Sequence, residues 1–197
     1  MEIINTKVYG LDESLIRSGY PMRVEPLEEE LPIPFDNSCQ RSIRLGNTPA
    51  GTGHDSFLKG ILVESDWIAP QYIWPQFQRY HFADIISSQS KMHMIVRMMA
   101  VPDRSKYFCK YVDQRAIDLV VEKVKAYNDN PTADNFETII ANTPSGLELG
   151  AGITTNYLQL KTMYNQRKNH RLKFWNTVFK EWCEGLDMFM ELTQGKE

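Results

Sequence analysis

The sequence predicts a single domain, spanning residues 1–197, in which a few strands combine with several helices. With 197 residues, the chain is long enough for one domain with a real core and too short for two ordinary domains and a linker. Hydrophobic residues make up 42% and charged residues 24%, an ordinary balance for a compact, soluble protein. Apolar runs with β-branched residues occur in the first third of the chain, whereas helical periodicity is clear after residue 113.

Two strands are predicted near the N-terminus. Residues 3–9 alternate weakly between apolar and polar side chains, which is typical of a half-buried strand. Residues 55–64 form an apolar run with β-branched members behind the turn-forming residues 47–54, so we expect a strand preceded by a polar loop. Between the two strands, residues 27–34 are acidic and interrupted by prolines, which indicates an irregular surface segment.

A helix is predicted to begin at Pro75, because proline is well accommodated in a first helical turn, and to run through Phe82 and as far as Ile86. Gln76 and Arg79 would then share one face of this helix, since they are three residues apart. The next apolar segment, residues 92–101, is rich in methionine. We expect these methionines to fill gaps in the core rather than to bind a cofactor.

Two amphipathic helices follow in the second half of the chain. Apolar residues recur at helical spacing from Asp113 to Tyr127, and this pattern ends before an Asn-Asp-Asn-Pro sequence. Thr132 is a good N-cap for a shorter helix that reaches Ile140. Both helices are interpreted as parts of the core.

The C-terminal third begins with residues 144–153, which contain three glycines. They lack the spacing of a phosphate loop and of a dinucleotide fingerprint, so we interpret them as a connector. Thr154 or Thr155 is expected to cap the next helix, which ends near a basic cluster at residues 167–171. The last helix presents one apolar face, made of Trp175, Val178, Phe179, Trp182 and Leu186.

Composition argues against several classes of function. The formal net charge of −3 and the pI near 5.9 argue against DNA or RNA binding, which usually requires a basic surface. The histidines have no metal-ligand spacing, so we expect no metal, and the cysteines lack the spacing of a disulfide framework. The sequence has no export signal and no apolar run long enough to cross a membrane, so we expect a cytoplasmic protein.

Residues 74–93 are the strongest candidate for a binding site. Two histidines, an arginine and a Ser-Ser-Gln-Ser run lie there among aromatic and aliphatic residues, and such polar groups are costly to bury without partners or a ligand. The guanidinium of Arg79 and the amide of Gln76 suit a phosphate or a pyrimidine ring. A buried helix end whose polar groups satisfy one another would explain the same composition.

Four stretches together resemble the flavin-dependent thymidylate synthase family. Residues 54–57 (HDSF) are similar to that family's His-x-Ser-Phe strand entry, and residues 76–79 (QFQR) to its Gln-x-x-Arg motif. His81 and residues 87–90 (SSQS) occur where the family has Arg-His-Arg, a seven-residue spacer and a serine. Residues 156–167 (NYLQLKTMYNQR) are similar in length and at both ends to the family's Asn to Leu-Arg helix.

The chain departs from the family pattern at its cationic positions. If Ser90 is the signature serine, residues 80–82 (YHF) replace Arg-His-Arg. If Arg79 is instead the first arginine, a one-residue insertion is needed before Ser90. The arginine expected two places after the serine is Met92, and another expected arginine is Ala141. These changes weaken the family's grip on flavin and phosphate.

The resemblance implies an α+β fold with a central sheet flanked by several helices, in a homotetramer whose sites are shared between subunits. It also implies that reduced FAD and methylenetetrahydrofolate convert dUMP to dTMP, with NADPH reducing the flavin. The residues implied to bind the cofactor FAD are His54, Ser56, Arg79, His81 and Asn156. Those implied to bind the nucleotide are Gln76, Gln89, Ser90 and Arg167.

Two of these residues, Ser90 and Arg167, are implied to be catalytic. Arg167 would place positive charge where negative charge develops on the pyrimidine ring. Two functions follow as alternatives. The first is an enzyme that transfers a one-carbon unit to dUMP or a related pyrimidine nucleotide. The second, suggested by the missing arginines, is a non-catalytic nucleotide-binding protein that keeps the fold but has lost flavin chemistry.

Overall fold

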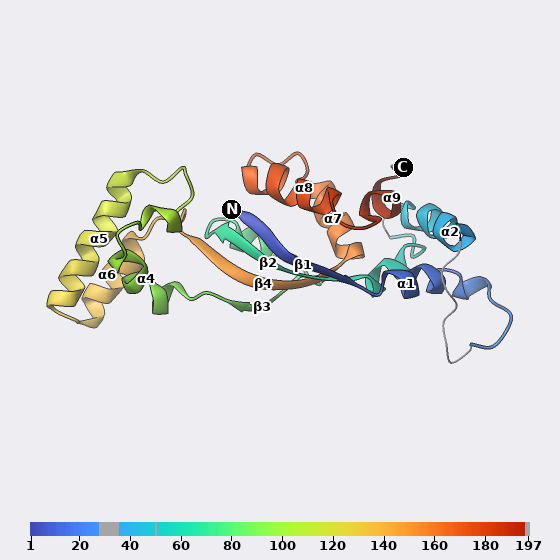
Figure 1. Cartoon of the computed structure of the whole chain (residues 1–197), viewed down its shortest axis with the longest axis horizontal. Helices are drawn as coiled ribbons and strands as arrows, with labels where there is room; N and C mark the ends of the chain where they lie inside the picture. The colour runs from blue at the N-terminus through green and yellow to red at the C-terminus, as the bar shows by residue number, and fades with distance from the viewer. Residues whose placement is uncertain (28–35, 50, 196–197) are drawn as a thin grey trace. The chain divides into compact units, whose positions relative to one another are not determined.

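The computed structural model describes residues 1–27, 36–49 and 51–195 (Figure 1). One four-stranded sheet has the strand order β1-β2-β4-β3. Together with the helices, it confirms the α+β class. The strands are β1 (Glu2–Tyr9), β2 (Leu62–Pro70), β3 (Asp84–Ser88) and β4 (Glu148–Asn156).

Contacts along the chain divide it into two compact units. Unit 1 comprises Met1–Glu2, Trp67–Arg79 and Ile85–Gly152. Unit 2 comprises Ile3–Asp66, Tyr80–Asp84 and Ile153–Glu197. Strands β2 and β4 therefore contribute residues to both units, and the expectation of one domain over residues 1–197 stays a prediction.

Unit 1 is built around an apolar core. Its helices are α3 (Trp74–Phe77), α4 (Lys91–Ala100), η3 (Ser105–Tyr107), α5 (Gln114–Asp129) and α6 (Ala133–Asn142). Helix α5 packs against both α4 and α6 (Figure 1). The facing sides bury Ile95, Val120 and Ile139 completely. Burial of such a side chain contributes about 1.5–3 kcal/mol.

The two amphipathic helices of unit 1 confirm their sequence predictions. The Asp113 side chain caps α5 by accepting a hydrogen bond from the Arg115 amide, and Thr132 caps α6 in the same way at the Asn135 amide. In α4, Met98 and Met99 are 4% and 2% exposed, as expected for core methionines. Met92, by contrast, is 52% exposed.

Unit 2 contains the remaining helices, which are α1 (Leu11–Arg17), η1 (Tyr20–Met22), α2 (Asp36–Gly46), η2 (Ser56–Gly60), α7 (Tyr157–Arg167), the π-helical turn η4 (Phe174–Phe179), α8 (Lys180–Glu184) and α9 (Phe189–Gln194). Helix α9 packs against α2 and α7. Tyr157 and Tyr164 of α7 meet the Phe189 ring edge to face, at centroid distances of 5.3 and 5.8 Å. The predicted apolar face of the last helix buries Trp175, Phe179 and Leu186 but leaves Val178 and Trp182 partly exposed.

The helix predicted to begin at Pro75 and to reach Phe82 or Ile86 is wrong beyond its first turn. Helix α3 is a single turn, and the sequence that was expected to end the helix forms strand β3. Gln76 and Arg79 therefore do not share a helical face, because Arg79 lies beyond the end of α3.

A left-handed residue separates α3 from β3. Phe82 has φ 26°, a conformation in which a side chain is strained and a helix cannot continue. Its carbonyl accepts a hydrogen bond from Thr155 Oγ1 at 2.9 Å, which holds this turn. Thr155 lies 73 positions from Phe82 in the chain, so no local sequence pattern predicts this contact.

The glycine-rich segment predicted to be a connector is strand β4. Its side chains alternate between partly exposed and buried, with Leu149, Ala151, Ile153 and Thr155 on the buried face. The N-cap of α7 is Asn156, not Thr154 or Thr155, because the strand runs on to the first residue of the helix. The predicted strand at residues 55–64 also needs correction, since Ser56–Gly60 form η2 and β2 begins at Leu62.

The predicted irregular acidic segment, residues 27–34, lies outside the described residues except for Leu27. Among the residues that the structure describes, no helix is both long and apolar enough to span a membrane.

Candidate functional site

Helix α7 of unit 2 positions two of the candidate site residues, Asn156 at its N-cap and Arg167 at its C-terminal end. Asn156 begins the helix, and its Oδ1 accepts a hydrogen bond from the Gln159 amide at 2.9 Å. Tyr157 and Leu160 are fully buried, which sets the face that α7 turns toward the core of unit 2. Arg167 is the last residue and lies at the negative end of the helix dipole, where a cation is favoured.

Arg167 is held by aromatic residues. Its Nε donates to the Tyr80 hydroxyl at 2.7 Å, and this hydroxyl donates to Gln166 Oε1 at 3.0 Å. The guanidinium carbon lies 4.9 Å from the centre of the Trp175 ring and 5.5 Å from that of Tyr80. Because a hydrogen bond and two ring contacts act together, the guanidinium plane has a fixed direction.

Tyr80 is the residue in this cluster that the sequence analysis did not select. In one alignment with the flavin-dependent family, Tyr80 occupies the place of the first arginine of Arg-His-Arg. The substitution removes a positive charge and adds a hydroxyl that both accepts from Arg167 and donates to Gln166. Tyr80 therefore orients a cation instead of supplying one.

His170 lies three residues beyond Arg167 and is kept neutral. Its Nδ1 accepts a hydrogen bond from the Leu172 amide at 3.1 Å, which requires the unprotonated nitrogen. Burial lowers the pKa of His170, and the nearby charges of Arg167 and Arg171 lower it further. The imidazole therefore adds no positive charge beside Arg167 at neutral pH.

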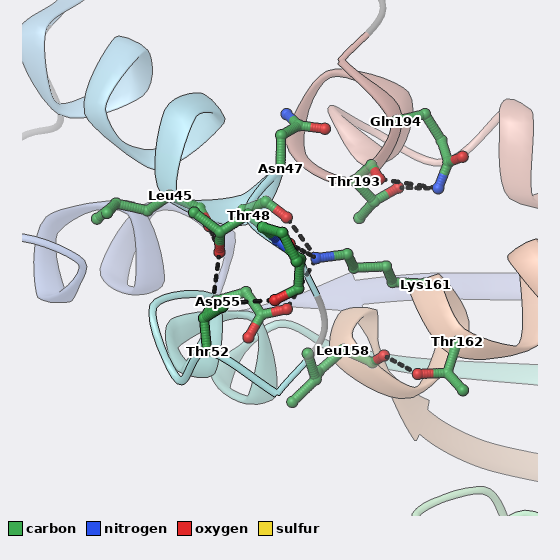
Figure 2. Close-up of polar contacts among 12 residues, drawn as sticks. Leu45, Asn47, Thr48, Thr52, Asp55, Leu158, Lys161, Thr162, Thr193 and Gln194 are labelled. Carbon is green, nitrogen blue, oxygen red and sulfur yellow. Dashed lines mark hydrogen bonds and ion pairs between the residues drawn. The ribbon is translucent and has the colours of Figure 1, made fainter.

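A buried ion pair fixes the loop that carries His54 and Ser56. Lys161 Nζ donates to Asp55 Oδ2 at 2.8 Å and to the carbonyls of Gly46 and Thr48 at 2.7 and 2.9 Å (Figure 2). The Lys161 and Asp55 side chains are 9% and 5% exposed. Three acceptors match the three N–H donors of an ammonium group, so this charge is fully satisfied.

Two cavities of unit 2 are lined in part by this segment and share Gly53 and Ser56. His54 and Ser56 both line a cavity of about 610 Å³ that reaches α1 and α2. Ser56 also lines a cavity of about 530 Å³, together with Lys59 and with Lys161 and Gln166 of α7. Both volumes fall in the range of about 300–1,000 Å³ that is usual for small-molecule sites.

The structure brings some predicted residues of unit 2 together and separates others. His54 and Ser56 share a cavity, as expected for two contacts of one ligand. Asn156 is the N-cap of α7 and Arg167 is its last residue. The helix has 11 residues and is about 16 Å long, so only an extended ligand could contact both. His81 is exposed and directly follows Tyr80 in the chain.

Four predicted site residues belong to unit 1. Gln76 donates from Nε2 to the Tyr72 carbonyl at 3.4 Å, and Arg79 is exposed just after α3. Ser90 is the N-cap residue of α4, but its side chain makes no capping hydrogen bond. The Ser90 hydroxyl is thus not engaged in helix capping.

Gln89 has a structural role in unit 1. Its backbone amide donates to the Gly150 carbonyl at 2.8 Å, and its Oε1 accepts from the Gly150 amide at 2.8 Å. Glycine at position 150 suits this approach, because an added Cβ would lie 3.4 Å from Gln89 Oε1. The Gln89 side chain thereby prolongs the pairing between β3 and β4.

The sequence analysis did not predict the Lys161–Asp55 ion pair or the contacts of Tyr80 and Trp175 with Arg167. A lysine on the buried face of α7, one residue from Leu160 and three from Tyr164, is a signal that could have indicated a buried charge with a partner. The identity of that partner, 106 positions away, could not be read from the sequence. The same holds for Tyr80 and Arg167, which are 87 positions apart.

Comparison with solved structures identifies the fold. The flavin-dependent thymidylate synthase ThyX from Helicobacter pylori, complexed with FAD and dUMP, is similar with a TM-score of 0.73 and 15% identity over 99% of each chain. The UMP/dUMP methylase PolB from Streptomyces cacaoi, bound with 5-Br dUMP, is similar with a TM-score of 0.59 and 15% identity, over 84% of this chain and 76% of that chain. No protein-family model and no curated protein sequence matches the chain. The chain therefore has the flavin-dependent thymidylate synthase fold.

Proposed function

We propose that this protein is a flavin-dependent methyltransferase that transfers a one-carbon unit from methylenetetrahydrofolate to dUMP or a related pyrimidine nucleotide. The observation that carries the proposal is Arg167, fixed by Tyr80 and Trp175 at the end of α7 in a fold shared with structures that contain dUMP or 5-Br dUMP. A guanidinium held in a fixed direction is suited to a pyrimidine imide, because its positive charge stabilises the negative charge that develops there.

The residues of unit 2 fit a phosphate-bearing cofactor such as FAD. His54 and Ser56 line a cavity whose other polar groups include three arginines, and among the described lining residues there is no acid. Reduced FAD would supply the electrons that convert the transferred carbon to a methyl group, and NADPH would restore it. Within this proposal, His54, Ser56, Arg79, His81 and Asn156 hold the cofactor.

The nucleotide is proposed to contact Gln76, Gln89, Ser90 and Arg167, with Ser90 and Arg167 acting in catalysis. Ser90 suits this role because its hydroxyl does not cap α4. Gln89 can contribute through its amide N–H groups, since its Oε1 is already bonded to Gly150. A homotetramer with shared sites completes the proposal, and light scattering of the purified protein measures the subunit number.

A direct assay tests the proposed reaction. The protein is incubated with FAD, NADPH, methylenetetrahydrofolate and dUMP or UMP, and methylated nucleotide is measured by mass spectrometry. We expect product with the wild type, and a loss of at least about 100-fold with Arg167→Ala, since charge-stabilising donors typically contribute that much. If the wild type neither takes up flavin nor alters either nucleotide, the enzymatic proposal fails.

A non-catalytic nucleotide-binding protein is the second candidate. Tyr80 and Phe82 favour it, because neither carries the charge of the corresponding arginines and Phe82 is 68% exposed. This candidate predicts dUMP binding that is lost in Arg167→Ala, with no turnover at any flavin concentration. Turnover that depends on Arg167 would exclude it.

A further inference from the structure

The larger cavity of unit 2 collects positive charge from two helices. Arg17 ends α1, and Arg41 and Arg44 lie on α2; all three line the same cavity of about 610 Å³, as does His54. No aspartate or glutamate is among its lining residues in the part of the chain that the structure describes. Neighbouring cations repel one another, and an anionic ligand would remove that cost.

One of these arginines is fixed by the fold itself. Arg41 Nε donates to Ser18 Oγ at 3.1 Å, and its Nη2 donates to the Leu15 carbonyl at 3.3 Å. The guanidinium thus satisfies carbonyls at the C-terminal end of α1, where a cation is favoured. Arg41 therefore anchors the wall of the cavity before any ligand enters.

The other two arginines are available to a ligand. Arg17 and Arg44 are exposed, and neither makes a hydrogen bond or ion pair with another described residue. Arg44 is three positions after Arg41 on α2, so both guanidinium groups lie along one side of that helix. The guanidinium groups of Arg17 and Arg44, beside the fixed one of Arg41, match a ligand that carries more than one negative charge.

Charge favours a diphosphate over a carboxylate in this cavity. A carboxylate carries one negative charge and is satisfied by a single bidentate arginine, which leaves two guanidinium groups unpaired. A diphosphate bridge carries one negative charge on each phosphate, and its oxygens can accept hydrogen bonds from several guanidinium groups. The rings of Tyr20 and Phe57 form the apolar part of the wall, which suits a flat base attached to the phosphates.

We propose that Arg17, Arg41 and Arg44 bind the diphosphate group of a dinucleotide cofactor, beside His54 and Ser56. This inference rests on the proposed flavin function for the identity of the cofactor, but not for the anion site itself. It accounts for the uncharged Tyr80 and Phe82, because positive charge on α1 and α2 replaces the charge that is missing at residues 80–82. The proposal thus assigns to α1 and α2 the positive charge that the family pattern has at residues 80–82.

Calorimetry with ligands that differ in their phosphates tests the site. FAD, ADP, inorganic pyrophosphate, dUMP and riboflavin are titrated into the wild type, Arg17→Gln, Arg44→Gln and the control Arg115→Gln. Arg115 is a suitable control because it is 90% exposed on α5 and pairs only with Asp113 among the described residues. We expect each site variant to weaken FAD and ADP about tenfold, the effect of one lost charge-assisted hydrogen bond, and riboflavin less than about twofold.

The outcomes separate this site from the proposed function. Arginine-dependent binding of ADP and pyrophosphate without any flavin uptake supports the diphosphate site and removes the flavin function. Equal affinities in the wild type and both site variants overturn the site, as does a wild type that binds none of the phosphate ligands. Weakening of dUMP alone by Arg17→Gln and Arg44→Gln would overturn it in favour of a nucleotide monophosphate. Urea unfolding of each variant verifies that the fold is retained.

Discussion

Unit 1 and unit 2 bury different kinds of side chain. The helices of unit 1 close on aliphatic residues, and Val120 and Ile139 are fully buried there. Unit 2 buries polar groups as well: Lys161 is bonded to Asp55, and the Tyr164 hydroxyl donates to Glu184 Oε1 at 2.6 Å. Burial and the Glu184 charge raise the pKa of Tyr164, so its hydroxyl remains a donor at any physiological pH.

This difference separates the aliphatic core of unit 1, which acts as a scaffold, from the oriented polar contacts of unit 2. Aliphatic burial stabilises a fold without specifying directions, whereas buried polar groups lose hydration and are tolerated only when their geometry is complete. In unit 2 the polar groups orient particular segments. The Lys161 and Asp55 pair fixes the loop of His54 and Ser56, and Tyr80 fixes the guanidinium of Arg167.

The largest expected effect comes from breaking the buried ion pair. Lys161→Met should lower the free energy of unfolding by about 3–5 kcal/mol, because it leaves the Asp55 carboxylate buried without its cation. The matched control is Lys123→Met, whose partner Glu122 is 69% exposed, and it should cost less than about 1 kcal/mol. Urea denaturation measures both.

The double variant Lys161→Met with Asp55→Leu sharpens this test. It should recover part of the lost stability, since no unpaired charge remains. A single variant as stable as the control would mean that the ion pair does not hold the loop.

The next effect separates orientation from stability. Tyr80→Phe removes the hydroxyl that accepts from Arg167 Nε, so dUMP affinity should fall about tenfold, as for one hydrogen bond to a charged group. Calorimetry with dUMP measures the change. Tyr111→Phe, at a residue that is 59% exposed, is the control and should bind dUMP like the wild type. Unchanged affinity in Tyr80→Phe would show that the hydroxyl does not orient the nucleotide site.

The aliphatic core of unit 1 should respond in stability alone. Ile139→Val removes one methyl group from a fully buried side chain, so the free energy of unfolding should fall by about 0.5–1.5 kcal/mol. Leu119→Ala, at a residue that is 37% exposed on α5, should change it by less than about 0.5 kcal/mol. Both variants should bind dUMP and FAD like the wild type. Weaker ligand binding in Ile139→Val would contradict a scaffold role for this core.

The same division explains what could be predicted from the sequence. Helices α5 and α6 could be predicted, α6 with its Thr132 cap, because the apolar spacing and the cap are local: Asp113 and Thr132 act on amides two or three residues away. Strand β4 was mistaken for a connector, since glycine has no side chain to show the alternation that its buried neighbours Ala151 and Ile153 follow. Local sequence patterns therefore predict the helices around the unit 1 core well.

The site depends on contacts that have no local pattern. His54, Ser56 and Arg167 were proposed from their resemblance to a family, but the residues that orient them were not. Lys161 could be placed on a helix face, yet its partner Asp55 lies in a distant loop. The arginines of α1 and α2 likewise converge only in the folded chain.

The smallest expected effect concerns the imidazole beside Arg167. Burial, with smaller contributions from Arg167 and Arg171, lowers the pKa of His170 in the folded protein, whereas the unfolded value is about 6.5. Between these two values the unfolded chain binds more protons, so stability is lost as pH falls through the window. Protonation would also break the bond in which Nδ1 accepts from the Leu172 amide.

His170→Asn removes this titration and retains an acceptor near the position of Nδ1. The free energy of unfolding of the wild type should therefore decline more than that of the variant when urea titrations are run from pH 7.5 down to 5. The two proteins should differ least above pH 7, where the imidazole is neutral in both folded and unfolded chains. Parallel pH profiles would mean that the imidazole accepts its proton equally in both states, and that His170 does not keep the C-terminal end of α7 free of a further charge.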